Sequence, residues 1–213
     1  MKWQASRISE LVSGYGELWS AQILASLLAH RATKNTRSSS PVTMDTSERT
    51  VGSDLQYVYL DARRVITIDE DAIQDGTVAW AVSKEKLHEV YEEERKKLGE
   101  KTSLHFVITG YVASNLQGVA TTLQRDGSDY SAAIVGRLLE ATKITIWTDV
   151  DGVLNADPRK VPLAQVIPEV SYNEAMELAY FGAKVIHPKT MQPALEEPEI
   201  PIYIRNTFTR LRG

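Results

Sequence analysis

Cysteine is absent from this sequence of 213 residues. The absence excludes disulfide bonds, thiolate catalysis and cysteine-ligated metal sites, and it fits a reducing compartment. Long apolar runs are missing too, because no stretch reaches the roughly 20 apolar residues that a helix needs to span a membrane. The first residues, Met-Lys-Trp-Gln-Ala-Ser-Arg, lack the apolar core of a signal peptide. We therefore expect no membrane association and no secretory leader.

An excess of positive charge is also missing, since 24 Lys and Arg stand against 28 Asp and Glu and the net charge is -4. A nucleic-acid-binding surface needs basic residues to neutralise phosphates, so the balance argues against a nucleic-acid partner. What remains is the composition of an ordinary globular protein, with 43% hydrophobic and 24% charged residues. The length suffices for one domain with a large core, and the pattern indicates no internal repeat and no second domain.

Strand-like and helix-like segments alternate along the chain, which predicts an α/β fold with a mostly parallel sheet. Residues 17–29 are apolar on nearly every face, which is typical of a helix that is mostly buried. Residues 144–148 form a continuous β run, suited to a parallel strand buried on both faces. Further helices are predicted at 84–98, after 128, at 172–181 and at 187–195, and further strands within 55–68, at 104–109 and at 200–204.

Two segments carry more local signals. Ser171 and Glu174 have the spacing of a capping box at the start of the helix predicted at 172–181. Residues 30–54 are rich in Ser and Thr and hold few large apolar side chains. We predict that this stretch is a flexible surface insertion.

The polar loop at residues 121–127 opens onto an apolar helix. Ser128 or Asp129 can cap that helix by accepting hydrogen bonds from its first free N–H groups. Free amides, the positive end of the helix dipole and Arg125 would then meet at one point, which suits a carboxylate or a phosphate. A simple N-cap without any ligand has the same pattern, so the residues themselves leave both interpretations open.

Other polar residues fall at predicted strand ends and helix starts, where parallel α/β sheets bind their ligands. The sequence has no nucleophile paired with a base, no Walker A motif, no protein-kinase catalytic loop and no Gly-x-Gly-x-x-Gly. Phosphoryl transfer needs mainly positioning and charge neutralisation, which cations and carboxylates supply. The pattern by itself indicates an anion-binding α/β enzyme. The polar set is Glu17, Arg125, Ser128, Asp129, Thr148, Asp149, Asp151, Asp157, Arg159 and Lys184.

Four segments in the same order resemble the amino-acid kinase family, and within it the aspartokinases. The segment Glu-Leu-Trp-Ser-Ala-Gln at residues 17–22 most resembles the kinase half of plant-type bifunctional aspartokinase–homoserine dehydrogenases. The resemblance implies a three-layer αβα sandwich and a partial catalytic domain over residues 1–213, with 30–54 as the main gap. The segments are 14–21 (Gly-Tyr-Gly-Glu-Leu-Trp-Ser-Ala), 121–129 (Thr-Thr-Leu-Gln-Arg-Asp-Gly-Ser-Asp), 147–152 (Trp-Thr-Asp-Val-Asp-Gly) with 157–159 (Asp-Pro-Arg), and 181–188 (Phe-Gly-Ala-Lys-Val-Ile-His-Pro).

The resemblance implies ATP-dependent phosphorylation of the side-chain carboxylate of L-aspartate to 4-phospho-L-aspartate, the first step toward lysine, threonine, methionine and isoleucine. Carried over by motif, Glu17 would contact the substrate amino group, and Arg125, assisted by Ser128, would hold a carboxylate. Asp129 and Lys184 would be the catalytic residues. Asp129 would orient the site and Lys184 would approach the phosphates.

The resemblance also implies a nucleotide pocket lined by Thr148, Asp149, Asp157 and Arg159. Mg²⁺ would accompany ATP and be held largely by phosphates and water, with no dedicated protein metal site. L-Aspartate and ATP are the implied partners, and full-length members of the family are expected to be homo-oligomers. The expected compartment is the cytoplasm, or the plastid in a photosynthetic eukaryote.

The sequence departs from the family at several positions. The family begins with a strand reading Lys-(Phe/Tyr)-Gly-Gly-Thr-Ser, which is missing here, so we expect a fold truncated at the N-terminus with an uncovered sheet edge. Losing one charge-stabilising group such as that lysine can cost about 10²–10³ in rate. Gln124 and Asp126 stand where many members have glycine, and Leu154 where many have tyrosine.

Two alternatives stay open at this point. One is a catalytically inactive remnant that binds nucleotide or an amino acid, or that serves as a subunit partner. The other is a sister kinase of the same fold that acts on glutamate, uridylate or carbamate. Glu17 and the amino-acid sequence of residues 125–129 disfavour the sister kinase.

Overall fold

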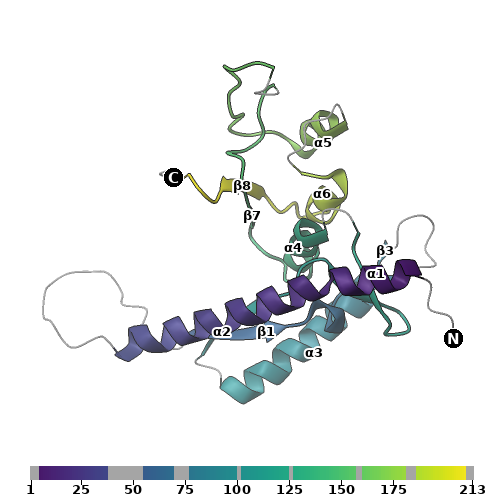
Figure 1. Cartoon of the computed structure of the whole chain (residues 1–213), viewed down its shortest axis with the longest axis vertical. Coiled ribbons are helices and arrows are strands. Elements are labelled where there is room, and N and C mark those ends of the chain that lie inside the picture. Colours follow the sequence, from purple (N-terminus) through teal and green to yellow (C-terminus); the bar gives the residue numbers. More distant parts are fainter. Residues whose placement is uncertain are drawn as a thin grey trace, which may run out of the picture. The chain divides into compact units, whose positions relative to one another are not determined.

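The computed structural model describes residues 5–37, 55–69, 77–99, 102–124, 127–156, 160–180 and 186–209, which form helices and three small sheets (Figure 1). The chain divides into two compact units, Met1–Thr122 and Leu123–Gly213, where the sequence pattern indicates one domain. Each unit is described by itself below. Within the described residues no helix is both long enough and apolar enough to cross a membrane.

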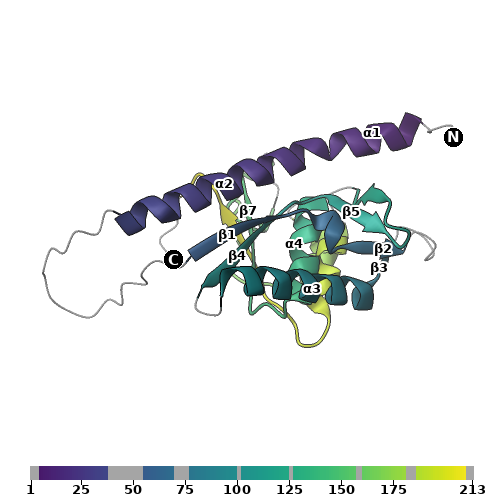
Figure 2. The same cartoon turned by 90° about the horizontal axis from the view of Figure 1, so that it is seen from below.

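The first unit begins with two helices in line, α1 (Ala5–Ser13) and α2 (Tyr15–Arg37), which follow one another as a long rod (Figure 2). A single residue, Gly14, separates the two helices. A Cβ atom on Gly14 would lie 2.7 Å from Cγ1 of Val112. Glycine therefore lets this junction approach strand β5 (Val112–Asn115) closely.

A two-stranded parallel sheet lies beneath α2. Strand β1 (Leu55–Leu60) pairs with β4 (Ser103–Ile108), so that Leu60 lies opposite Ile108. Helix α3 (Trp80–Leu98) lies on the other side of this sheet, which gives the unit helix, sheet and helix layers (Figure 2). Helix α3 ends at Leu98, as predicted, with Gly99 as its C-cap, but it begins at Trp80 and not at residue 84.

A second, mixed sheet in this unit consists of β3 (Thr77–Val78), β2 (Thr67–Asp69), β5 and β6 (Ala120–Thr122), in that order. Strand β2 pairs parallel with β5, whereas the other two pairings are antiparallel. A short 3-10 turn, η1, connects β1 to this sheet, and the backbone N–H of Ala62 donates a 2.7 Å hydrogen bond to Oγ1 of the buried Thr109. The turn η1 covers Ala62–Arg64.

Helix α2 differs from expectation in two ways. It continues to Arg37, so residues 30–37 are helical rather than part of an insertion, and 38–54 lie outside the described residues. The prediction of a mostly buried helix is wrong, because Trp19 is 62% and Ile23 69% exposed. In this unit the sheet covers only the side of α2 that carries Leu18, Ala21 and Ala25.

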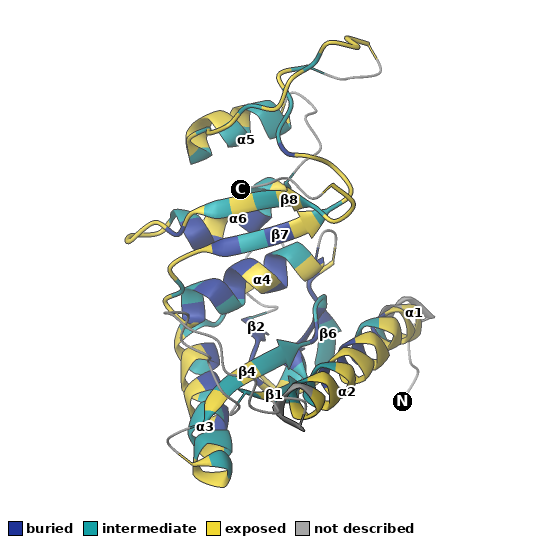
Figure 3. Cartoon of the chain, turned by 90° about the vertical axis from the view of Figure 1, so that its left-hand side faces the viewer, coloured by how far each residue is buried: buried dark blue, intermediate teal, exposed yellow. Residues whose placement is uncertain are grey.

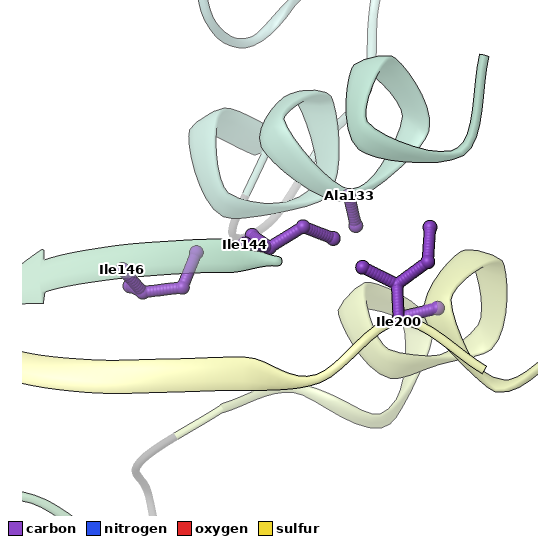
Figure 4. Close-up of a cluster of buried hydrophobic side chains, with 5 residues drawn as sticks. Ala133, Ile144, Ile146 and Ile200 are labelled. Carbon is purple, nitrogen blue, oxygen red and sulfur yellow. The ribbon is translucent and has the colours of Figure 1, made fainter. Parts of the chain in front are cut away.

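The second unit is built on a parallel pair of strands, β7 (Ile144–Thr148) and β8 (Ile202–Asn206). Helices α4 (Gly127–Leu138) and α6 (Pro188–Leu195) cover one face of this pair. A buried cluster joins helices and strands, and four of its side chains are labelled in Figure 4. Its members are Ala133, Ile144, Ile146, Ala194 and Ile200.

The predicted burial of β7 on both faces is wrong. Ile144 and Ile146 are buried under the two helices, whereas Trp147, which points to the opposite face, is 63% exposed. The reason is the alternation of side chains along a strand combined with helices on one face only. The bounds of β7 and the mostly parallel α/β class are as predicted.

Two helix starts follow their sequence signals closely. Helix α5 (Tyr172–Tyr180) begins with the predicted capping box, in which the Ser171 N–H donates to Glu174 at 2.8 Å and the Glu174 N–H donates to Ser171 Oγ at 3.3 Å. The Ser171 hydroxyl also donates to the Glu174 carboxylate at 2.8 Å, and the bond from the Ser171 N–H together with this one lowers the pKa of Glu174. At α6, His187 is the N-cap, and its Nδ1 accepts a hydrogen bond from the Lys189 N–H at 3.1 Å.

Candidate functional site

The predicted site residues are spread over both units. Glu17 lies in the first unit, and Ser128, Asp129, Thr148 and Asp149 lie in the second. The other four predicted residues fall outside the described residues, and their roles stay predictions. They are Arg125, Asp157, Arg159 and Lys184.

Glu17 is half-buried in the first turn of α2. A carboxylate at this place is favoured by the positive end of the helix dipole. The backbone carbonyl of Glu17 accepts a 3.0 Å hydrogen bond from Ser20 Oγ. This bond is to the backbone of Glu17 and leaves its carboxylate oxygens uninvolved.

Helix α4 begins one residue earlier than the predicted cap. Because Gly127 is its first residue, Ser128 and Asp129 lie in the first turn and not at the N-cap position. Ser128 is exposed, Asp129 is half-buried, and Gly127 is buried. The first four N–H groups of a helix have no partner within the helix, so the start of α4, where Ser128 is exposed, is the kind of place that suits an anion.

The residue Gln124, three positions before α4, has a positive φ of 63°. This left-handed conformation costs roughly 1–2 kcal/mol for a residue with a Cβ atom and almost nothing for glycine. Gln124 thus has a backbone conformation that glycine adopts easily. It stands at a position where many aspartokinases have glycine. The conformation of Gln124 is therefore imposed by the fold against the intrinsic preference of this residue.

The carboxyl end of β7 carries two predicted nucleotide-pocket residues. Thr148 Oγ1 donates a 3.2 Å hydrogen bond to Oδ1 of Asp149, which is exposed. Two residues on, Asp151 accepts hydrogen bonds from Asn206 Nδ2 at 2.8 Å and Thr209 Oγ1 at 2.7 Å. Both hydrogen bonds lower the pKa of Asp151, and the bond from Thr209 has the larger effect. The loop after β7 is thereby tied to the end of β8.

Beyond Asp151 the chain makes a close hairpin-like contact. Gly152 has a φ of 148°, and a Cβ atom there would lie 2.9 Å from Val166 Cγ1. Leu154 and Val166 form an isolated antiparallel bridge, and the Ile167 N–H donates to the Val153 carbonyl at 2.8 Å. The glycine of the Asp-Val-Asp-Gly motif is therefore explained by local packing.

The direction of the helices brings these parts of the second unit to one end. Gly136 near the end of α4 contacts Ile144 at the start of β7, so helix and strand run antiparallel, and the start of α4 lies at the carboxyl end of β7. Lys189 Nζ in the first turn of α6 lies 5.2 Å from the ring centroid of Tyr130 in the first turns of α4. Two helix N-termini and the carboxyl ends of two parallel strands therefore share one edge of the unit, which is where α/β proteins bind ligands.

A cavity of about 940 Å³ lies in the same unit, between the loop after β7, helices α5 and α6, and strand β8. Its volume is typical of small-molecule sites. Asp151 and Gly152 line it, together with Tyr172, Met191 and Tyr203. No signal in the sequence predicts this cavity, because most of its lining comes from apolar residues on elements far apart in the chain. No group of three metal-ligating side chains occurs among the residues for which coordinates are described.

Comparisons with known proteins agree with the motifs. The sequence model of the amino acid kinase family matches residues 2–206. The chain is 38% identical over 200 residues to the chloroplastic bifunctional aspartokinase/homoserine dehydrogenase 1 of Arabidopsis thaliana, which covers 94% of this chain and 19% of that protein. The chain thus spans about a fifth of the length of this plant relative.

Solved structures give the same picture. The chain is similar to E. coli aspartokinase III in complex with aspartate and ADP, with a TM-score of 0.60 and 35% identity over 72% of this chain and 32% of that one. It is also similar to the aspartate kinase from Synechocystis, with a TM-score of 0.63 and 25% identity over 99% of this chain and 29% of that one.

Proposed function

This chain belongs to the amino acid kinase family, and from that premise we propose that it forms part of the catalytic domain of an aspartokinase. The reaction is the transfer of the γ-phosphoryl group of ATP to the side-chain carboxylate of L-aspartate. A carboxylate oxygen attacks the γ-phosphorus, the bond to the bridging oxygen breaks, and ADP leaves. The E. coli relative, 35% identical, is named as a complex with aspartate and ADP.

The observation that carries this proposal is the edge of the second unit at which α4, α6 and the carboxyl end of β7 meet. Both reactants are anions, so the site has to neutralise negative charge before it can hold them side by side. The positive end of the dipole of α4 suits a phosphate or a carboxylate. The residues present therefore fit a nucleotide.

We assign the roles within this site as follows. Arg125 and Ser128, next to the start of α4, hold a substrate carboxylate. The motif at Glu17, in the first unit, supports a separate assignment, in which its carboxylate binds the substrate ammonium group. Asp129 orients the site. Lys184, three residues before the His187 cap of α6, neutralises charge on the phosphoryl group during transfer.

The nucleotide side of the site consists of Thr148 and Asp149 at the end of β7, with Asp157 and Arg159 further along the same loop. Asp151 is not a ligand in this scheme. Its hydrogen bonds to Asn206 and Thr209 hold the loop in place. Mg²⁺ would enter the site with ATP and would supply positive charge that offsets the charge of the phosphates; we assign no residue of this chain as its dedicated ligand.

The test is an assay of ADP release, coupled to NADH oxidation, with ATP, Mg²⁺ and L-aspartate. The protein should carry any residues that precede this chain in its natural reading frame. We expect ADP release that depends on L-aspartate and is not supported by D-aspartate, L-glutamate, uridylate or carbamate. Release supported equally by L-glutamate, or no release with L-aspartate, would refute the proposal.

The relatives support a proposal for the compartment. The Arabidopsis thaliana relative is named as chloroplastic. If this chain comes from a photosynthetic eukaryote, we propose the plastid, and otherwise the cytoplasm. A fluorescent fusion of the natural reading frame, imaged in its own cell type, decides between the two.

A further inference from the structure

Thr190, in the first turn of α6, carries a buried hydroxyl group without a hydrogen-bond partner. The residue is fully buried, with an exposed fraction of 0%. Within the described part of the chain, its Oγ1 is the only buried side-chain nitrogen or oxygen atom that lacks a partner. Buried polar atoms in native proteins are nearly always paired, because an unpaired one bears the full cost of losing its water. An unpaired hydroxyl at this position therefore needs an explanation.

The surroundings of Thr190 follow from the packing of Ala194, one helical turn further along α6. Side chains four positions apart lie on the same helix face. Ala194 belongs to the buried cluster that includes Ala133 and Ile146, both labelled in Figure 4. Figure 3 shows α4 and α6 beside β7, with buried segments of both helices in dark blue. Thr190 therefore faces the same interior, one turn closer to the start of α6.

Two predicted site residues lie one step beyond the same cluster in the same direction. On α4, Asp129 precedes the buried Ala133 by one helical turn. On β7, Thr148 follows Ile146 by two positions, so both side chains point to the face that the helices cover. Asp129 and Thr148 are both half-buried. At the edge where α4 and α6 begin, the apolar cluster thus passes into a polar layer formed by Asp129, Thr148 and Thr190.

Within this polar layer, the Asp129 carboxylate is the acceptor that best suits the Thr190 hydroxyl. A threonine hydroxyl donates one hydrogen bond, and an ionised carboxylate accepts up to about four. Thr148 Oγ1 donates its own proton to Asp149 at 3.2 Å and could accept from Thr190. A hydrogen bond to a charged group is roughly twice as strong as one between neutral groups, which favours Asp129. Catalytic hydrogen bonds often tighten only when the reactants are bound.

We propose that the Thr190 hydroxyl donates a hydrogen bond to the Asp129 carboxylate when the reactants are bound, and so fixes the orientation of that carboxylate. This inference rests on the proposed function, in which Asp129 orients the site. Because Thr190 is fully buried, no reactant reaches its side chain, and it is a positioning residue that acts through Asp129. The unpaired hydroxyl destabilises the free protein, and reactant binding relieves that cost. Local costs of this kind are typical of functional sites.

Two substitutions at Thr190 separate the role of its hydroxyl from that of its methyl group. Thr190→Val keeps the branched shape and removes the hydroxyl, so it should raise the melting temperature of the free protein by at least about 2 °C. Thr190→Ser keeps the hydroxyl and should lower the melting temperature, because it leaves a small cavity. The control is Thr145→Val, which makes the same change on the opposite face of β7 and should alter neither reactant binding nor turnover.

The melting temperature in the presence of Mg²⁺, ADP and L-aspartate gives a readout that does not depend on turnover. Ligands that bind only the folded state raise the melting temperature. We expect the increase in Thr190→Val to be smaller than in the wild type by at least about 2 °C, since the variant has no hydroxyl to donate to Asp129. Thr190→Ser and Thr145→Val should show the full increase.

Steady-state kinetics tests the link between Thr190 and Asp129. Thr190→Val should lower kcat/KM for L-aspartate about 10- to 100-fold, as expected for a misplaced catalytic group, and Thr190→Ser should retain most of the activity. In an Asp129→Ala background, Thr190→Val should have little further effect, because the acceptor is already gone. Additive losses in the double variant, or an equal loss in Thr190→Ser, would overturn the inference.

This inference and the proposed function can fail separately. Wild-type turnover and reactant binding that persist unchanged in Thr190→Val would overturn the inference and leave the proposed function in place. If the wild type releases no ADP with L-aspartate, the proposed function is wrong, and the melting temperatures decide the inference. A reactant-induced increase that is equal in the wild type and Thr190→Val, or absent from both, would then overturn it.

Discussion

The side chain of Arg137 holds helices α4 and α6 of the second unit together at their carboxyl ends, and its loss should destabilise that unit strongly. From the last turn of α4, Nε donates to the Pro193 carbonyl at 2.6 Å. Nη2 donates to the carbonyls of Ala194 at 3.5 Å and Pro198 at 3.1 Å, and also to that of Glu196. The last carbonyls of α6 have no partner within the helix, and the negative end of its dipole favours a cation here.

The perturbation is Arg137→Met, which keeps the apolar length of the side chain and removes every donor. The bonds to Pro193 and Ala194 are partly buried and those to Glu196 and Pro198 are exposed. Counting mainly the partly buried bonds, at about 1–1.5 kcal/mol each, gives a loss of roughly 2–3 kcal/mol in the free energy of unfolding.

Urea denaturation followed by circular dichroism measures this loss, provided that the slope with denaturant stays constant. The control is Lys143→Met, an exposed cation in the same unit, which we expect to change stability by less than about 0.5 kcal/mol. Arg137→Lys keeps the charge without the planar fork and should fall between the two. A loss below about 1 kcal/mol for Arg137→Met, or one equal to that of Lys143→Met, would refute the reasoning.

Three further predictions concern the candidate site. Gln124→Gly should raise the free energy of unfolding by up to about 1 kcal/mol, because glycine relieves the positive φ of 63°; a loss of stability in urea denaturation would contradict this. The pKa of Asp151 is lowered by folding, so its ionised form stabilises the protein above the ordinary pKa of 3.8, and this contribution is lost as pH falls through the lowered pKa. The melting temperatures of the wild type and Asp151→Asn should therefore differ at about pH 5 and converge at acid pH, and a difference that stays constant with pH would argue against the bonds to Asn206 and Thr209. Arg125→Ala should raise the KM for L-aspartate strongly while the KM for ATP changes little, and an unchanged KM for L-aspartate would show that Arg125 is misplaced.

Local sequence signals predicted local structure well. The Ser171 and Glu174 capping box starts α5, and the His187-Pro188 pair starts α6. These elements depend on a few neighbouring residues whose hydrogen bonds are nearly independent of the rest of the fold. The resemblance to aspartokinases is carried by short ordered motifs of the same kind, and the comparisons confirm it.

The wrong predictions concern which side of a helix or strand is covered by a neighbour. An apolar face says that burial is favourable, but not whether a neighbour is present to bury it. Ile23 on α2 and Trp147 on β7 are therefore exposed although the sequence favours burial for both. The positive φ of Gln124 could not be predicted either, because it is imposed by the loop against the preference of the residue.

The central claim is that the protein phosphorylates the side-chain carboxylate of L-aspartate, and trapping the product with hydroxylamine tests it most directly. An acyl phosphate reacts with hydroxylamine to give a hydroxamate, which is coloured with ferric ion and identified by mass spectrometry. With ATP, Mg²⁺ and L-aspartate, the protein with its natural upstream residues should give the β-hydroxamate of aspartate in amounts equal to the ADP released. ADP release without any aspartate hydroxamate, or neither product, would contradict the account.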